Sequence, residues 1–379
     1  MKVLLFSAYY LPGYKGGGPI KTVANLINMT FDVVEYKVVT GDRDLGDTHS
    51  YSDVTHGKWN CLSNCSIFYL GSGIQGILNI ILNIFKCKKD IVYLNSFFSV
   101  KFSFIPLLIA KAFKRKVVIG PRGEFSKGAL SLKFKKKNIY IKLYKILRLH
   151  KGIVFQASSE YEAEDIRRIL GPNVDVFIAE DVGAQDFAST LPARKNDMLS
   201  VVFISRISPM KNLLGALEML KDVKQPMLYH IYGPIEDLDY WSNCKSVIKT
   251  LPPHVQVEYK GELTPDRVVK TLAVYDVFFM PTKGEAYGHV IAEALCSGLP
   301  ILIADTTPWR NLQKMGIGWD LPLGQPEEFS ATLDKLAVTS IGDYQKMRET
   351  VLAWAKNKFS QRDAIEANIA MFRYANEKS

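Results

Sequence analysis

Two glutamates stand eight residues apart in one segment of the chain, Val277 to Ala304, and both are suited to contacting a polar ligand. The apolar run VFFMP predicts a strand, TKGEAYGHVIAEALCSG a loop followed by a helix, and LPILIA a second strand. Glu285 falls in the loop, and Glu293 falls about two turns into a helix expected to begin near Gly288. The segment therefore predicts a single site at a loop and a helix N-terminus.

The chemistry expected there is the binding of a diphosphate and of hydroxyl groups. Backbone N–H groups at a helix start favour anions, and a glycine lets the backbone approach closely. Glu293 would accept hydrogen bonds from ribose hydroxyls, and Glu285 would meet a sugar. The expected binding residues around the helix start are Ala286, Tyr287, Gly288, His289 and Val290. The alternative is that both glutamates are solvated helix residues, but an unpaired carboxylate in the apolar run around Glu293 would be costly to bury.

The elements that must position this site recur along the whole chain of 379 residues, which is long enough for two domains. Near-continuous apolar strands alternate with helical patterns, as a parallel sheet covered on both faces requires. The first half contains KVLLFSAYY, EYKVVTGD, DIVYLNS, KVVIGPR and GIVFQASS; the second contains LSVVFIS, MLYHIYG, VQVEYKG, DVFFMP and LPILIAD. Because the pattern restarts after the polar stretch 191–198, we expect an interdomain linker there. The segment from about 361 to 376 has helical spacing and no following strand.

Four segments of the chain resemble those of a known family. EAYGHVIAE resembles the E-x7-E signature of glycosyltransferase family 4, the retaining enzymes of the GT-B type, and FISRISPMKN, HIYGP and EYKGEL resemble other family segments in family order. The resemblance implies an α/β GT-B fold, with two Rossmann-like domains facing a central cleft and a C-terminal helix returning to the N-terminal domain. It implies an acceptor domain at 1–188 with helix 359–379, and a nucleotide-sugar-binding domain at 189–358.

The resemblance also implies roles for residues outside the glutamate motif. Arg206 and Lys211 would neutralise the donor diphosphate, as two cations beside a departing anion should. Glu262, in EYKGEL, would lie near the nucleobase. Taken alone, the two cations slightly favour an exposed basic loop, but their position directly after a strand end and upstream of the glutamate motif favours a functional role.

In the first half, the turn after the first strand, YYLPGYKGGGPIK, resembles the family's Gly-rich loop, and Gly17 and Gly18 are the expected contacts at a helix start. The expected acceptor-side residues are Asn95, Ser96, Arg122 and Glu124. Two departures stand out. Many family members have a histidine where this chain has Asn95 to Phe97, and IAEDVGAQD replaces a Pro-Asn-Gly turn at the interdomain crossover.

The charge of the chain, +10, indicates an anionic partner. Residues 127–151 read as a basic amphipathic helix, which favours either an anionic membrane surface or ordinary docking with a solvated basic face. The apolar-then-basic run LNIILNIFKCKK adds weight to the membrane. No apolar stretch reaches the roughly 20 residues of a membrane span. Five scattered cysteines predict free thiols in a cytosolic protein rather than a metal site at Cys61 and Cys65.

Together these observations predict a cytoplasmic hexosyltransferase bound peripherally to the inner face of the plasma membrane. It would transfer a sugar from a nucleotide-sugar, UDP-sugar by family frequency, to a lipid-linked saccharide in the synthesis of O-antigen, capsule or exopolysaccharide. No cofactor or metal is expected, because cations and helix dipoles stabilise the leaving group in this family. A nucleotide-sugar epimerase of the same fold is the alternative. A nucleic-acid-binding protein is disfavoured, and GYKGGGP lacks the dehydrogenase spacing.

Overall fold

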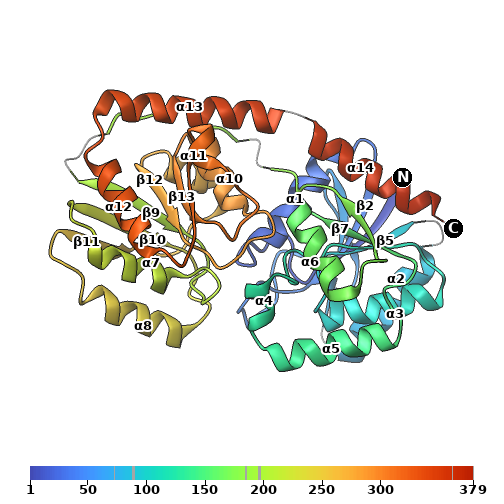
Figure 1. Ribbon diagram of the computed structural model, residues 1–379. Helices are drawn as coiled ribbons and strands as arrows, with labels where there is room; N and C mark the ends of the chain where they lie inside the picture. The colour runs from blue at the N-terminus through green and yellow to red at the C-terminus, as the bar shows by residue number, and fades with distance from the viewer. Residues whose placement is uncertain (72, 88–89, 184–185, 195–197, 361, 379) are drawn as a thin grey trace. The chain divides into compact units, whose positions relative to one another are not determined.

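The computed structural model describes residues 1–71, 73–87, 90–183, 186–194, 198–360 and 362–378. The chain forms two compact units (Figure 1): Met1–Val182 together with Arg362–Ser379, and Gly183–Gln361. Residues 195–197 of the predicted linker, and 184–185 of the crossover segment, lie outside the described residues.

The first unit is built on a sheet in which, among the described residues, β3 alone runs antiparallel to its neighbour. The strand order is β3-β4-β2-β1-β5-β6-β7-β8. The strands are β1 (Lys2–Phe6), β2 (Glu35–Gly41), β3 (Trp59–Cys61), β4 (Cys65–Leu70), β5 (Ile91–Leu94), β6 (Val117–Ile119), β7 (Ile153–Ala157) and β8 (Asp175–Ile178). The central strands β1, β5, β6 and β7 are buried almost throughout, as a sheet covered on both faces requires.

The helices of the first unit connect these strands. They are α1 (Gly18–Thr30), α2 (Gly73–Lys86), the π-helical turn η1 (Val100–Phe104), α3 (Ile105–Ala112), α4 (Lys127–Ser131), α5 (Phe134–Ile146) and α6 (Glu160–Leu170). The prediction of one basic helix over 127–151 is wrong in extent. Leu132 is extended and Lys133 takes a left-handed conformation (φ 55°), so the chain turns between α4 and α5.

The second unit is built on a parallel sheet with the order β11-β10-β9-β12-β13-β14 within the described part of the chain. Its strands are β9 (Leu199–Ile204), β10 (Met227–Tyr232), β11 (Val255–Tyr259), β12 (Val277–Met280), β13 (Ile301–Ala304) and β14 (Gly318–Leu321). Its helices are α7 (Leu213–Met219), η2 (Leu220–Asp222), α8 (Leu238–Ile248), η3 (Pro265–Arg267), α9 (Val268–Leu272), α10 (His289–Cys296), α11 (Leu312–Met315), α12 (Pro326–Ala337) and α13 (Ile341–Ser360). The predicted strand-loop-helix-strand segment is thus β12, a loop, α10 and β13.

The last helix, α14 (Asp363–Glu377), belongs to the first unit and packs against α1, β5, β6 and β8 (Figure 1). Phe372 is fully buried, and its ring lies 6.3 Å from that of Tyr36 and 5.7 Å from that of Tyr93. The predicted return of a C-terminal helix to the N-terminal domain is confirmed. Its predicted start at 359 is wrong, because Phe359 lies in the last turn of α13 and packs against Trp309 and Trp354 of the second unit.

Candidate functional site

The candidate donor site lies where strands β9, β10 and β12 of the second unit end. These strands are parallel neighbours, so the loops that follow them meet at one edge of the sheet. The loop after β9 is fastened to the loop after β12, because the carbonyl of Met210 accepts hydrogen bonds from the backbone of Lys283 (2.9 Å) and the hydroxyl of Thr282 (3.2 Å). Arg206, Lys211 and Glu285 are therefore presented from two loops that support each other.

Lys211 and Glu285 form a close ion pair. The Lys211 Nζ donates to Glu285 Oε1 at 2.5 Å, and the side chains are only 15% and 10% exposed. An ion pair so far removed from water needs well-placed neighbours, since each charge gives up hydration. The sequence predicted both residues as site residues separately, and the structure brings them into direct contact.

Arg206 lies beside the turn that follows β10. Its guanidinium pairs with Glu236 at 2.7 Å, and both side chains remain about one-third exposed. Gly233 forms that turn at φ 134°, where a Cβ atom would lie 2.0 Å from the carbonyl oxygen of Ser205. Only glycine fits this approach, which holds the end of β9 and hence Arg206 against the β10 turn.

Gly288 caps helix α10 at φ 84°, a left-handed conformation suited to glycine, and the helix begins at His289 as the sequence predicted to within a residue. A Cβ at Gly288 would lie 2.8 Å from Ile291 Cδ1. The Tyr287 carbonyl accepts a hydrogen bond from the Trp309 indole, and the Tyr287 and His289 rings lie 4.9 Å apart. The backbone before the helix is therefore fixed by aromatic packing.

The remaining predicted donor-side residues differ in burial. Glu293 is 6% exposed and Tyr287 4% exposed, whereas Ala286 and Val290 are half-buried. Glu262 is exposed in the loop after β11. That loop is joined to the β10 turn by a hydrogen bond from the Gly233 N–H to the Gly261 carbonyl at 2.9 Å.

In the first unit, Gly17 and Gly18 mark the start of α1. Gly17 precedes the helix at φ 67° and ψ −128°, and its carbonyl accepts from the N–H groups of Ile20 and Lys21. The glycines follow the loop after β1, at the carboxyl edge of the sheet, where ligands of parallel sheets bind. No other residue type adopts this backbone conformation readily.

Arg122 and Asn95, predicted on the acceptor side, belong to a buried network. The Arg122 Nε donates to Asn95 Oδ1 at 2.8 Å, and the guanidinium pairs with Asp181, with both side chains almost fully buried. Burial opposes the charge of Arg122, but the adjacent Asp181 carboxylate holds the pKa of the guanidinium above its ordinary value. Asp181 also accepts from the hydroxyl of Thr22 in α1 at 2.9 Å.

Ser96 and Glu124 form a second cluster. Glu124 accepts hydrogen bonds from the Ser96 hydroxyl (2.8 Å) and from the N–H groups of Phe97 (2.5 Å) and Phe98 (3.2 Å). Burial nevertheless raises the pKa of the Glu124 carboxyl. The structure thus brings the four predicted acceptor-side residues to neighbouring strand ends and gives each of their side chains a partner within the protein.

Two residues of these arrangements were not predicted from the sequence. Glu236 pairs with Arg206, and its signal was an acidic residue in the turn that follows the strand and its Gly-Pro pair, HIYGP, beside a basic residue at the end of the neighbouring strand. Asp181 pairs with Arg122, and its signal was an acidic residue just after an apolar strand, in FIAEDV. Strand β8 was not predicted, so Asp181 could not be placed at a strand end.

Within the described residues, no cluster of three or more His, Cys, Asp or Glu side chains could hold a metal ion. No helix in the described part of the chain has the length and apolar character needed to cross a membrane.

Residues 186–352 match the family model described as Glycosyl transferases group 1. The sulfoquinovosyl transferase SQD2 of Arabidopsis thaliana is 31% identical over 104 residues, which are 27% of this chain and 19% of that protein. The chain thus matches about a fifth of the length of this curated relative. The matched residues 186–352 make up most of the second unit.

Solved structures resemble the chain over almost its full length. Anabaena Alr3699/HepE in complex with UDP and glucose superposes with a TM-score of 0.72 at 16% identity, over 99% of both chains. WaaG, a glycosyltransferase involved in lipopolysaccharide biosynthesis, superposes with a TM-score of 0.68 at 12% identity, over 97% of this chain and 99% of that chain. The fold is the two-domain α/β GT-B fold. The prediction of this fold is confirmed. The match of residues 186–352 to glycosyl transferases group 1 agrees with the predicted enzyme class.

Proposed function

We propose that this chain is a retaining glycosyltransferase of family 4 that transfers a sugar from a UDP-sugar to a lipid-linked saccharide in bacterial surface polysaccharide synthesis. The observation on which the proposal rests is the Lys211–Glu285 ion pair, which lies within the residues that match glycosyl transferases group 1 and beside the loop leading to α10. The cation can bind a diphosphate, and the carboxylate beside it can accept hydrogen bonds from the sugar attached to that diphosphate.

The donor assignment follows from the charges at this edge of the second sheet. Arg206 and Lys211 would neutralise the diphosphate, and the backbone before α10 would donate to its oxygens. Glu293 would accept from ribose hydroxyls, and Glu262 would lie near the base. UDP is favoured because the similar Anabaena structure contains UDP and glucose.

In the proposed reaction, the bond between the anomeric carbon and the β-phosphate oxygen breaks while the acceptor hydroxyl oxygen bonds to that carbon on the same face. The departing phosphate takes the acceptor proton, and UDP leaves. Negative charge grows on the phosphate in the transition state, so fixed cations there lower the barrier. Arg206 and Lys211 supply that stabilisation without a metal, and Glu285 orients the sugar.

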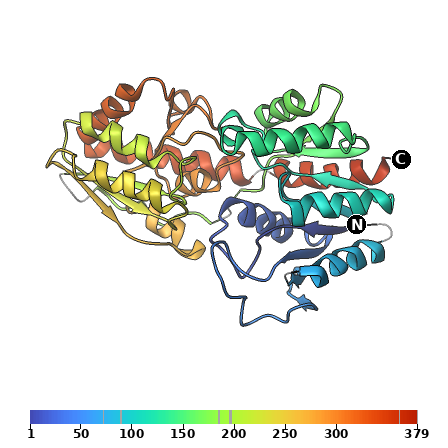
Figure 2. The ribbon, with the colours of Figure 1, turned by 90° about the horizontal axis from the view of Figure 1, so that it is seen from below.

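The acceptor assignment concerns the first unit. Helix α5 exposes apolar residues among lysines, with Ile139 68% and Ile146 76% exposed, on the outside of that unit (Figures 1 and 2). Helix α2 exposes Ile74 and Phe85 in the same way. Apolar side chains interleaved with cations suit an anionic membrane surface. A lipid-linked acceptor at the inner face of the plasma membrane fits that surface, and the similar WaaG acts in lipopolysaccharide biosynthesis.

A donor screen tests the proposal. The full chain is incubated with UDP- and GDP-sugars, with and without an extract of lipid-linked saccharides, and nucleoside diphosphate release and the product anomer are recorded. Acceptor-dependent release of UDP with retained anomeric configuration is the expected result. Acceptor-independent turnover of the donor would favour an epimerase, and inverted configuration would reject the retaining mechanism.

A further inference from the structure

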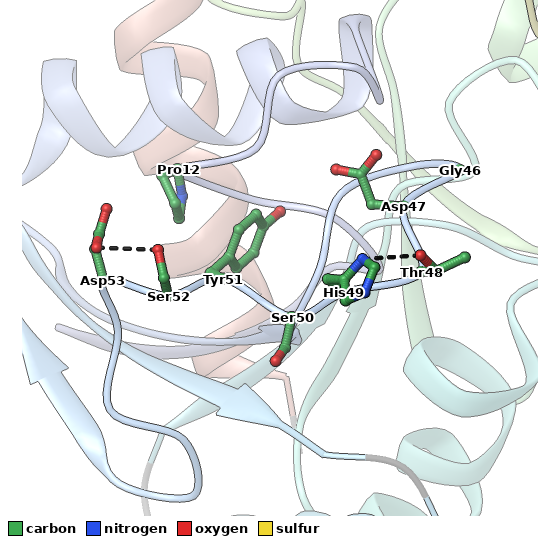
Figure 3. Close-up of a pocket in the computed structure, with 9 residues that line it drawn as sticks. All are labelled: Pro12, Gly46, Asp47, Thr48, His49, Ser50, Tyr51, Ser52 and Asp53. Atoms are coloured by element: carbon green, nitrogen blue, oxygen red, sulfur yellow. Dashed lines mark hydrogen bonds between the residues drawn. The ribbon is translucent and has the colours of Figure 1, made fainter.

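A polar pocket lies in the first unit, at the long loop that follows β2. It has a volume of about 440 Å³ and is lined by Pro12 and by the continuous segment 46–53. In the view of Figure 3, the Tyr51 ring lies between Pro12 and the His49 ring, with the Asp47 carboxylate close by. We call it the 46–53 pocket.

The loop that forms the pocket is held in place by the loop after β1. The Asp44 carboxylate accepts from the N–H groups of Tyr14 (2.7 Å) and Lys15 (3.0 Å), and the Lys15 ammonium pairs with Asp47 at 2.7 Å. Strands β1 and β2 are parallel neighbours, so both loops lie at the carboxyl edge of the sheet, next to the start of α1. The 46–53 pocket therefore occupies a part of the edge where ligands of such sheets bind.

The pocket is acidic in a basic protein. Its lining contains two carboxylates, Asp47 and Asp53, and no lysine or arginine, whereas the whole chain has a charge of +10. The Lys15 ammonium pairs with Asp47 from outside the lining, so Asp53 supplies the remaining negative charge. Carboxylates repel phosphate groups, so a nucleotide or a lipid phosphate is a poor ligand here. Among the described residues no three-ligand metal cluster exists, which disfavours a cation as well.

The polar groups of the lining instead match a sugar ring. The Ser50 hydroxyl can donate and accept. The Ser52 hydroxyl donates to Asp53 Oδ1 at 3.0 Å, so it can accept from a sugar hydroxyl, as can the Asp53 carboxylate. The Pro12 and Tyr51 rings supply apolar surface for the C–H face of the ring.

We propose that the 46–53 pocket binds one sugar residue of the acceptor, a neutral or amino-bearing hexose. This inference rests on the proposed function for its identification of the ligand as acceptor. His49 and Asp53 are exposed in the loop, so they contact the sugar without supporting the core. They determine acceptor specificity and take no part in donor binding.

Saturation-transfer NMR on the full chain tests the pocket, with the methyl glycosides of glucose, galactose, mannose, glucosamine and N-acetylglucosamine as probes. At least one probe should bind, and the double variant His49→Ala/Asp53→Ala should weaken its binding about tenfold or more, as the loss of charged hydrogen bonds implies. Asp32→Ala, which removes an exposed aspartate elsewhere in the first unit, is the matched control and should bind like the wild type.

Binding of UDP to the same samples separates the two proposals. UDP affinity unchanged in the double variant, together with weakened sugar binding, supports the pocket. No probe binding to the wild type, or equal probe binding to the double variant, overturns the pocket whatever UDP does. Failure of the wild type to bind UDP overturns the donor proposal and leaves the sugar-binding result standing.

Discussion

At the scale of single residues, the two predicted donor-side cations of the second unit are paired with carboxylates in different environments. Lys211 is paired with Glu285 away from water, whereas Arg206 is paired with Glu236 at the surface. A surface pair contributes little free energy and is exchanged readily. A donor diphosphate would therefore displace Glu236 from Arg206 more easily than it would displace Glu285 from Lys211.

Replacing Glu236 with alanine should consequently tighten UDP binding. Removal of a competing surface carboxylate should raise UDP affinity about two- to fivefold, which isothermal calorimetry measures. Glu218→Ala, which breaks the exposed pair with Lys221 in the same unit, is the matched control and should leave UDP affinity unchanged. Weaker UDP binding in Glu236→Ala would mean that Glu236 itself helps to hold the donor.

Gly233→Ala should destabilise the protein through a steric clash. The new Cβ would lie 2.0 Å from the Ser205 carbonyl oxygen, so the end of β9 must move, and we expect a loss of about 1–3 kcal/mol in the free energy of unfolding. Gly261→Ala is the control, because Gly261 also has a positive φ (82°) but no atom within 4 Å of the added Cβ. Equal losses in urea unfolding of the two variants would show that backbone strain, not the clash, decides the cost.

At the scale of elements, α14 is fastened to the first unit by a buried amide. Asn368 is 1% exposed, donates to the Glu180 carbonyl at 2.8 Å and accepts from the Gln156 amide at 3.0 Å. Asn368→Ala should lower the free energy of unfolding by about 1–3 kcal/mol, because it leaves buried polar groups without a partner. The exposed Asn376→Ala on the same helix should have no measurable effect in the same urea titration. Equal free energies of unfolding for Asn368→Ala and the wild type would refute this role of Asn368.

Helix α5 provides the element-scale test of membrane binding. Ile139→Ser/Ile146→Ser removes two exposed apolar side chains and should weaken binding to phosphatidylglycerol vesicles about tenfold or more, since each buried isoleucine contributes about 1.5–3 kcal/mol. Vesicle flotation measures this binding, and Leu238→Ser/Ile341→Ser, exposed positions of the second unit, is the control. A wild-type chain that does not float would remove the membrane proposal.

At the scale of the whole molecule, the strands and helix starts that depend on local sequence pattern were predicted from the sequence. The ten long apolar runs became strands, and the segment from β12 to β13 was placed correctly, because Gly288 and the run after it define a helix start. Four strands were not predicted: β3, β4, β8 and β14. They are short or lie toward sheet edges, where half-exposed residues obscure the apolar pattern of a strand.

In the candidate site too, residues were predicted from local sequence, whereas the contacts between them were not. Lys211 and Glu285 were predicted from sequence, but their contact spans 74 positions of the chain and depends on the fold. The internal pairing of Arg122 with Asp181 could not be predicted either, since nothing in the local sequence shows whether a strand-end arginine faces solvent or a carboxylate. Residue types at strand ends were therefore predictable, and their partners were not.

The most direct test of the central claim is the rate of sugar transfer from a UDP-sugar to a lipid-linked saccharide extract by Lys211→Ala and Glu285→Ala. We predict a loss of about a hundredfold or more in each, because both groups act on the reacting donor. Each variant is assayed well below its own unfolding temperature, since deleting one partner of a buried ion pair lowers stability. Glu258→Ala, which breaks an exposed pair with Lys260 in the same unit, should retain the wild-type rate. Undiminished transfer by Glu285→Ala in a folded protein would contradict the account.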